Sequence, residues 1–146
     1  MRAILLILAC SASSLVHAQG CNIDLTTGDQ IKYDKSSVTV SSKCPTITVT
    51  LTHTGKLPAQ AMGHDVVIAS ADTYQAVAQD GLQAGLAGNY VKAGDPRVVA
   101  STKVIGGGET ATTSFAGNKL KAGGAYKFFC TAPGHVALMN GALIVE

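Results

Sequence analysis

The chain has 146 residues, of which 47% are hydrophobic, and its 11 basic and 9 acidic side chains leave a formal net charge of +2. This length fits one compact domain. So small a charge excludes the strongly basic surface that binds nucleic acid or an anionic membrane, and no run of like charges, internal repeat or second hydrophobic span adds such a partner.

Residues 1–18 have the pattern of a secretory signal peptide. The short positive region Met1-Arg2 precedes the apolar run Ala3–Leu8, and small residues lead to a cleavage site after Ala18. The apolar run is too short to remain as a membrane span. We therefore expect export of a single domain, residues 19–146.

Removal of the signal peptide changes the cysteine count. Cys10 falls within the removed segment, where a lipoprotein signal is an alternative that Leu8 fits poorly. An odd number remains, so in an oxidising compartment two should pair and one should stay free. Cys21 and Cys44 lie early in the chain with no His or Met close by, and are the expected disulfide. Cys130 is then a free thiol, which has to be buried or bound to a metal.

Most of the chain has the pattern of β-strands separated by turns. In Thr46–His53 threonines alternate strictly with Ile47, Val49, Leu51 and His53, which is typical of a half-buried strand. Turn signals at 43–45, 106–108 and 122–124 separate the runs. In chain order, the expected strands are Ile31–Val40, Thr46–His53, His64–Ala69, Arg97–Ile105, Thr110–Phe115, Ala125–Cys130 and Ala142–Val145.

One segment, Asp72–Leu86, breaks the strand pattern. Tyr74, Val77 and Leu82 lie near helical spacing and Asp72 is a candidate N-cap, although two glycines weaken the helix. We expect a short helix inserted between strands. The whole pattern predicts an all-β fold, a Greek-key β-sandwich of about seven or eight strands with one short inserted helix.

The stretch from Cys130 to Met139 carries the clearest chemical signal. It places a thiol, an imidazole and a thioether on one loop, in the spacing Cys130-x4-His135-x3-Met139. Thiolate is a soft ligand that suits both oxidation states of copper, two imidazoles complete a trigonal plane, and a weak axial thioether tunes the potential. His64, at the start of an expected strand, supplies the second imidazole. The pattern indicates an electron-transfer copper site.

Each of these residues has a simpler explanation when taken alone. Met139 precedes an apolar strand and fits a core position, His135 fits an exposed loop, and Cys130 fits a buried inert thiol. The combination favours a metal, and the axial Met favours copper over zinc. His53 shares a strand face with apolar residues, so we expect a hydrogen-bonded core histidine near the site, whose titration with redox state the sequence leaves open.

Two other functions would use the same residues. A copper carrier or storage protein without redox turnover favours exposed clusters of Met or His, and the sequence has none. A thiol hydrolase using Cys130 and His135 needs an orienting third group, a cleft and an oxyanion site, and no residue near the loop supplies them. We therefore expect a redox protein that is not an enzyme.

Several short motifs occur together across nearly all of residues 19–146. They are Cys21, Leu57-Pro58, Met62-Gly63-His64, Thr102-Lys103, Gly106 to Glu109, Phe128-Phe129-Cys130-Thr131, Pro133-Gly134-His135 and Ala137-Leu138-Met139. With these motifs the sequence resembles the azurins, a bacterial group within the cupredoxin family of blue copper proteins. The length of the ligand loop separates azurins from the shorter-looped plastocyanins and pseudoazurins.

The resemblance implies a monomeric electron carrier of the bacterial periplasm with one type 1 copper ion per chain. It implies the Cys21–Cys44 disulfide as well. Asp65 and His53 would lie beside the ligands. The implied ligands in the plane of the copper are His64, Cys130 and His135. The implied distant axial donors are Met139 and the carbonyl of Gly63.

The resemblance also implies a docking surface. In azurins the histidine of the ligand loop presents its ring edge through an apolar patch, so electrons would pass through His135. A small, weakly charged patch suits transient contacts with cytochromes or with copper reductases or oxidases, burying less than roughly 1,200 Å². The residues expected in the patch are Leu57, Met62, Leu82, Ala132, Pro133 and Leu138.

Three positions depart from the azurin pattern. Asp65 stands where azurins usually have Asn; an ionised carboxylate should favour Cu(II) and lower the potential, whereas a protonated one would keep the neutral hydrogen bonding. Ala132 replaces a bulkier, usually aromatic residue, which should leave the loop less packed and His135 more open to water. Ser101 stands where some azurins carry a surface histidine, so a contact made there would be lost.

Overall fold

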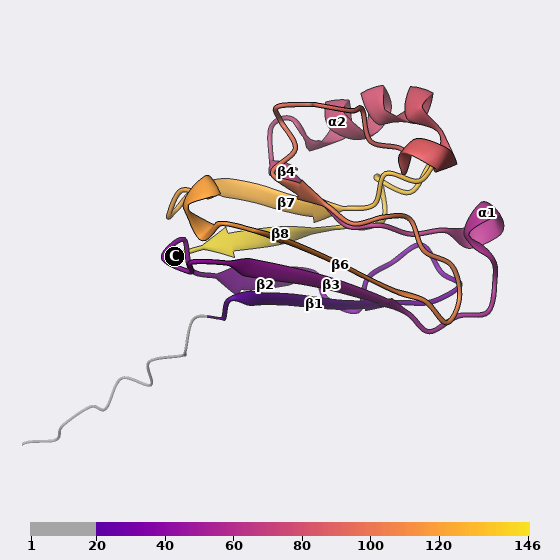
Figure 1. The fold of residues 1–146 in the computed structure, drawn as a ribbon, viewed down its shortest axis with the longest axis horizontal. Coiled ribbons are helices and arrows are strands. Elements are labelled where there is room, and N and C mark those ends of the chain that lie inside the picture. The colour runs from indigo at the N-terminus through magenta and orange to yellow at the C-terminus, as the bar shows by residue number, and fades with distance from the viewer. Residues whose placement is uncertain (1–19) are drawn as a thin grey trace, which may run out of the picture.

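The computed structural model describes residues 20–146, which form a Greek-key β-sandwich of two sheets, as the strand pattern predicts (Figure 1). The expected signal peptide lies outside the described residues. The smaller sheet has the strand order β1-β3-β6 and the larger one β2-β8-β7-β4-β5. The strands are β1 (Asn22–Thr27), β2 (Ser37–Val40), β3 (Ile47–His53), β4 (Val67–Ser70), β5 (Ala100–Ser101), β6 (Thr110–Phe115), β7 (Ala125–Phe129) and β8 (Asn140–Val145).

Strand β3 forms the centre of the smaller sheet because its alternate residues are apolar. Ile47, Val49 and Leu51 are fully buried between the sheets, and the threonines between them face outward and are half-buried. The strand pairs in parallel with β1 and antiparallel with β6. The same alternation carries His53 inward, where it is only 1% exposed.

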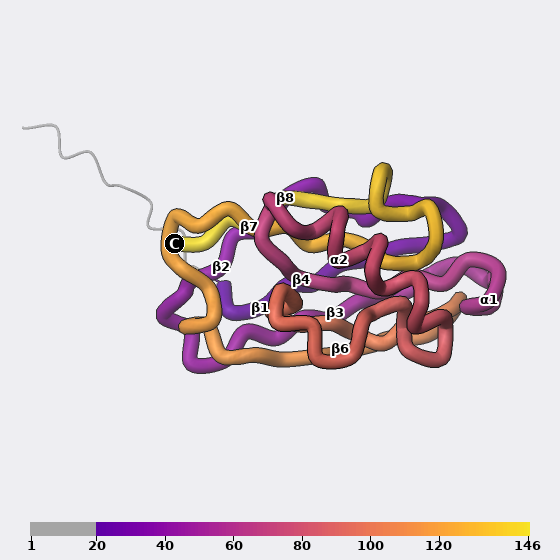
Figure 2. Tube along the Cα trace, turned by 90° about the horizontal axis from the view of Figure 1, so that it is seen from above, coloured from indigo at the N-terminus to yellow at the C-terminus, as the bar shows by residue number. Residues whose placement is uncertain are grey.

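The larger sheet is buried on both faces at its centre. Ile68 and Phe128 point into the core between the sheets, whereas Val67 and Phe129 belong to a second cluster on the other face. Helix α2 (Tyr74–Gly81) covers that second cluster with Val77. Figures 1 and 2 show α2 lying over β4 and β7. The helix and the turns after it, residues 74–89, are called the helical segment below.

Several strands are shorter than the sequence pattern predicts. The segment before β2 turns instead, because the N–H of Asp34 donates to the carbonyl of Thr26 at 2.9 Å. Around β5, the hydroxyl of Thr102 accepts the N–H of Val66 at 3.0 Å, where a longer strand would use main-chain atoms. His64 forms only an isolated bridge with Ile105, ahead of β4.

The inserted helix is also shorter than expected. It ends at Gly81 and continues as two 3₁₀ turns, η1 (Leu82–Ala84) and η2 (Leu86–Gly88). A Cβ on Gly81 would lie 2.0 Å from the carbonyl oxygen of Tyr90, so glycine is required where the chain returns past the helix. The N-cap is Thr73 rather than Asp72. A four-residue helix, α1 (Ala59–Met62), was not predicted, because so short a turn leaves no periodic pattern.

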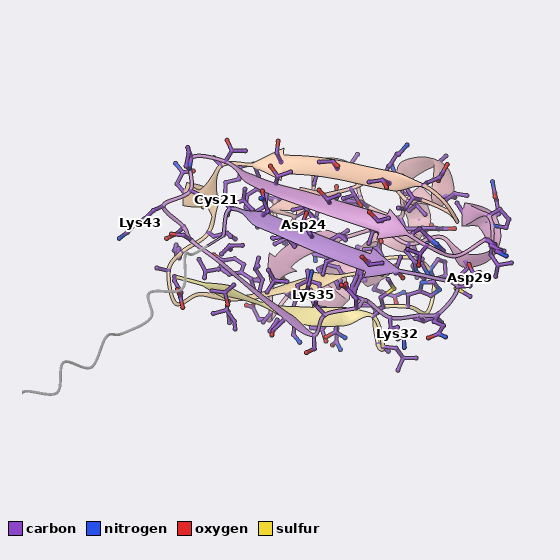
Figure 3. All side chains as sticks on the ribbon, turned by 90° about the horizontal axis from the view of Figure 1, so that it is seen from below. Cys21, Asp24, Asp29, Lys32, Lys35 and Lys43 are labelled. Atoms are coloured by element: carbon purple, nitrogen blue, oxygen red, sulfur yellow. A yellow bond between two sulfur atoms is a disulfide. The ribbon has the colours of Figure 1, made fainter. Side chains whose placement is uncertain are left out.

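The two ends of the sandwich differ. Helix α1 and the loop between β7 and β8 lie at the end away from the C-terminus (Figures 1 and 2). The Cys21–Cys44 disulfide is formed, and Figure 3 shows Cys21 and Asp29 at opposite ends. A further 3₁₀ turn, η3 (Gly117–Lys119), precedes β7. No helix within residues 20–146 is long and apolar enough to cross a membrane.

Candidate metal centre

Cys130 follows directly on β7, which fixes its position at the end of the larger sheet. Its N–H donates to the carbonyl of Met139 at 3.0 Å, and this bond closes the loop 131–139. Inside the loop, the N–H groups of His135 and Met139 donate to the carbonyls of Ala132 and His135 at 3.0 and 2.8 Å. The loop is therefore held by its own main-chain hydrogen bonds, without a metal.

His64 comes from the other side of the same end. Its N–H and carbonyl both pair with Ile105, at 3.0 and 2.8 Å. The ring nitrogen Nε2 lies 3.1 Å from the carbonyl oxygen of Gly28, so Nε2 carries the proton and donates it there. This bond fixes the ring and leaves Nδ1 free to act as a ligand.

The side chains of His64, Cys130 and His135 converge at this end of the sandwich. Their ligand atoms lie within 4.8 Å of one another. The Cys130 Sγ is 3.9 Å from Nδ1 of His64 and 3.5 Å from Nδ1 of His135. Within residues 20–146 this is the only such cluster, and Cys130 is the only free cysteine.

Burial controls the protonation of these three groups in the metal-free protein. It raises the pKa of the Cys130 thiol well above its usual value, with the charge of Asp65 adding to the effect. Burial, followed by the charges of His135 and His53, lowers the pKa of His64 to about 4, and burial lowers the pKa of His135. At neutral pH both imidazoles are thus neutral, and only the thiol has to lose a proton when a metal binds.

The donor set fits one copper ion. A thiolate and two neutral imidazoles, held together in a buried site, suit copper in both of its oxidation states. Full burial of Cys130 also speaks against the alternative of a catalytic nucleophile, which needs access to a substrate.

The two candidate axial donors belong to the segments that adjoin the three ligands. Met139 is fully buried and joins the core between the sheets. Gly63 immediately precedes His64, and a Cβ there would lie 2.4 Å from the carbonyl oxygen of Ala59 and 2.7 Å from Cγ1 of Val104. Only glycine fits this position, so the chain passes close to the site without a side chain in the way.

Asp65 is fully buried and bonded to the residue after Cys130. Thr131 donates its N–H to Oδ1 at 2.8 Å and its hydroxyl to Oδ2 at 2.5 Å. Tyr33 donates its hydroxyl to the main-chain carbonyl of Asp65 at 2.5 Å. Burial raises the pKa of Asp65 to about 6, while the hydrogen bonds from Thr131 oppose that rise. Asp65 therefore ties the His64 segment to the Cys130 segment.

His53 packs against His64 and contacts the segment that precedes it. Its ring stacks on that of His64, with centroids 5.1 Å apart. Its Nδ1 accepts the N–H of Gly55 at 3.1 Å, so Nε2 carries the proton and donates to the carbonyl of Met62 at 3.0 Å. The ring thereby holds the segment that leads to Gly63.

The residues expected in the docking patch differ in exposure. Leu57 and Leu138 are 42% and 72% exposed, and Pro133 is exposed as well. Met62 and Leu82 are half-buried. Ala132 differs from the expectation, because it is only 6% exposed and packs in the core between the sheets. His135, whose ring is 5.0 Å from that of His64, is half-buried.

Some residues at the site carry no sequence signal of their own. Gly28 contributes only its carbonyl, and Thr131 was noted only as part of a motif. Asn89, from the helical segment, contacts both sides of the site, and nothing in the sequence connects it with Cys130. These roles depend on the folded arrangement of distant segments.

Comparisons with known proteins agree with this geometry. Residues 19–146 match the family model described as copper binding proteins, plastocyanin/azurin family. The chain is 50% identical to azurin from Bordetella pertussis over 131 residues, covering 90% of this chain and 87% of that one. It is 48% identical to azurin from Pseudomonas denitrificans, covering 86% and 98% of the two chains.

A solved structure gives the same result. The azurin Az-iso2 of Methylomonas sp. strain J superposes with a TM-score of 0.83 at 39% identity, covering 86% of this chain and 98% of that one. Fold, donor set and sequence agree, and the chain belongs to the plastocyanin/azurin family of copper-binding proteins.

Proposed function

We propose that this chain is an electron carrier of the bacterial periplasm, exported by residues 1–18 and active as a monomer formed by residues 19–146. The observation that carries the proposal is the buried cluster of His64, Cys130 and His135 in a chain of a copper-binding family. Bound copper supplies the one-electron couple Cu(I)/Cu(II). The full burial of the Cys130 thiol, which keeps a substrate away from the sulfur, supports a carrier rather than an enzyme.

We propose that copper would be held by His64, Cys130 and His135, with Met139 and the Gly63 carbonyl as weaker additional donors. The residues around them restrict movement. The Cys130–Met139 main-chain bond holds the loop, and Gly28 holds the ring of His64. A site fixed in this way needs little rearrangement when the charge of the metal changes, which favours fast electron transfer.

Electrons would pass through His135 across an apolar docking patch. We assign to this patch Leu57, Met62, Leu82, Pro133 and Leu138, with Ala132 in the layer beneath. The exposure of Leu57 and Leu138 next to the ligand loop supports the assignment. Such a patch suits brief contacts with redox proteins such as cytochromes or copper reductases and oxidases.

The test compares two charge variants in the copper-loaded protein. Leu138→Lys places a cation in the proposed patch, whereas Ile144→Lys places one on β8, at a leucine-sized residue that is 46% exposed away from the loop. Electron self-exchange, measured by NMR line broadening in a mixture of oxidised and reduced protein, should slow by about tenfold or more in Leu138→Lys, because two cations then face each other. Ile144→Lys should match the wild type.

Equal rates in all three proteins would refute the docking patch. Slow exchange in the wild type itself, together with rapid loss of copper to a mild chelator, would refute the electron-carrier function and favour copper carriage or storage.

A further inference from the structure

Asn89 stands out in the helical segment, which provides none of the proposed ligands. It follows η2 with a left-handed backbone, φ 55°, which only Tyr90 shares among the non-glycine residues in the part of the chain that the structure describes. Asparagine tolerates this conformation better than most residues. The conformation turns its side chain and its carbonyl toward two different segments.

The side chain of Asn89 reaches the His64 side of the site. Its Oδ1 accepts the N–H of Val104 at 2.8 Å, and Val104 is buried. The next residue, Ile105, pairs with both main-chain groups of His64. The side chain of Val104 also limits the space at Gly63, since Cγ1 would lie 2.7 Å from a Cβ there. A shift of Val104 would therefore displace both His64 and Gly63.

The main chain of Asn89 reaches the Cys130 side. Its carbonyl oxygen lies 3.3 Å from the hydroxyl oxygen of Thr131, a weaker contact that shares the one hydroxyl hydrogen with the 2.5 Å bond to Asp65. Thr131 directly follows Cys130. Thus one residue accepts a hydrogen bond from Val104, next to the His64 segment, and contacts Thr131, next to Cys130.

We propose that Asn89 is a positioning residue for the metal centre, which sets the separation of the His64 and Cys130 segments through Val104 and Thr131. The proposal rests on the assignment of His64 and Cys130 as ligands. On this proposal the helical segment contributes to the site through Asn89. Asn89 holds the His64 and Cys130 segments in place whether or not a metal is bound. Outer contacts of this kind orient metal ligands and are needed for their geometry.

Three variants separate positioning from general stability. Asn89→Gly keeps the left-handed backbone but removes the acceptor for Val104. Asn89→Asp keeps an acceptor oxygen at the same place. Asp80→Asn is the matched control, because it removes the Arg97–Asp80 pair in the same helical segment without removing a group that contacts Val104 or Thr131.

The first measurement is the reaction of the Cys130 thiol with Ellman's reagent in the metal-free proteins, compared with the unfolding constant of each from urea titration. Loss of a buried hydrogen bond should speed labelling of Asn89→Gly by about tenfold beyond any change in its unfolding constant. Asn89→Asp should label within about twofold of the wild type after the same correction, and Asp80→Asn should follow its unfolding constant alone.

The second measurement is the electron paramagnetic resonance spectrum of the copper-loaded proteins. The copper hyperfine splitting should change in Asn89→Gly and stay unchanged in Asp80→Asn. The proposal is overturned if labelling of Asn89→Gly only follows global unfolding, or if Asn89→Asp behaves like Asn89→Gly. These outcomes are distinct from failure of the proposed function, which would appear as a wild type without a thiolate-bound copper spectrum.

Discussion

Among single residues, Asp65 has the most direct bearing on redox behaviour. Its carboxyl is fully buried, and burial raises its pKa to about 6 against the hydrogen bonds from Thr131, so the group is ionised at pH 8. Negative charge next to the ligands stabilises Cu(II) more than Cu(I). We expect Asp65→Asn to raise the reduction potential at pH 8 by about 40 mV, equivalent to about 1 kcal/mol.

Cyclic voltammetry at a fixed pH checks this expectation. Asp24→Asn is the control, because it removes the same charge from an exposed residue of β1 (Figure 3). The control should leave the potential nearly unchanged. A potential that stays the same or falls in Asp65→Asn would contradict the charge argument.

The residues of the site show how far a sequence can lead. The spacing from Cys130 to Met139 identifies the ligand loop directly, because the chemistry depends on residue types only a few positions apart. The depth of a side chain is harder to predict: Ala132 was expected at the surface and lies in the core. The part played by Asn89 is set by a left-handed turn and two distant partners, which leave no local pattern.

At the level of elements, an ion-pair network fastens the helical segment. Arg97 donates to Asp95 at 2.5 Å through Nη2 and at 2.8 Å through Nε, and to Asp80 of α2 at 2.6 Å. The Asp95 side chain is almost fully buried, and its bonds to Arg97 lower its pKa to about 2.

This lowered pKa gives a stability prediction with a defined sign. A carboxylate with a lowered pKa in the folded state stabilises the fold above the ordinary Asp pKa of about 3.9, and the contribution is lost as the pH falls toward 2. We expect Asp95→Asn to lower the free energy of unfolding by on the order of 1 kcal/mol at pH 7. Urea titrations of the metal-free proteins should show this difference shrinking below pH 4; a difference independent of pH would contradict it.

The elements also show where pattern and structure differ. Strand β3 was predicted nearly to the residue, because a half-buried strand alternates strictly. The expected strand Arg97–Ile105 shrinks to β5, where the hydroxyl of Thr102 and the side chain of Asn89 replace main-chain acceptors for Val66 and Val104. Which side chains replace main-chain acceptors depends on which segments meet in the fold. The alternation of apolar residues along the chain does not predict this.

For the whole molecule, the disulfide contributes to stability at a distance from the candidate metal centre. Cys21–Cys44 joins residues 23 positions apart at the end opposite Asp29 (Figure 3). In the chain-entropy model, removing it in a Cys21→Ala/Cys44→Ala variant lowers the free energy of unfolding by about 3 kcal/mol. Differential scanning calorimetry should show a lower Tm with the visible spectrum of the copper-loaded protein unchanged. An altered spectrum would mean that the two ends are coupled.

The account as a whole depends on a direct bond between copper and the Cys130 thiolate. The visible absorption spectrum of the protein loaded with one equivalent of Cu(II) tests this bond most directly. We predict an intense thiolate-to-Cu(II) charge-transfer band, a blue solution, one copper ion per chain, and loss of the band in Cys130→Ser. A pale wild-type solution, or a blue colour that survives in Cys130→Ser, would contradict the account.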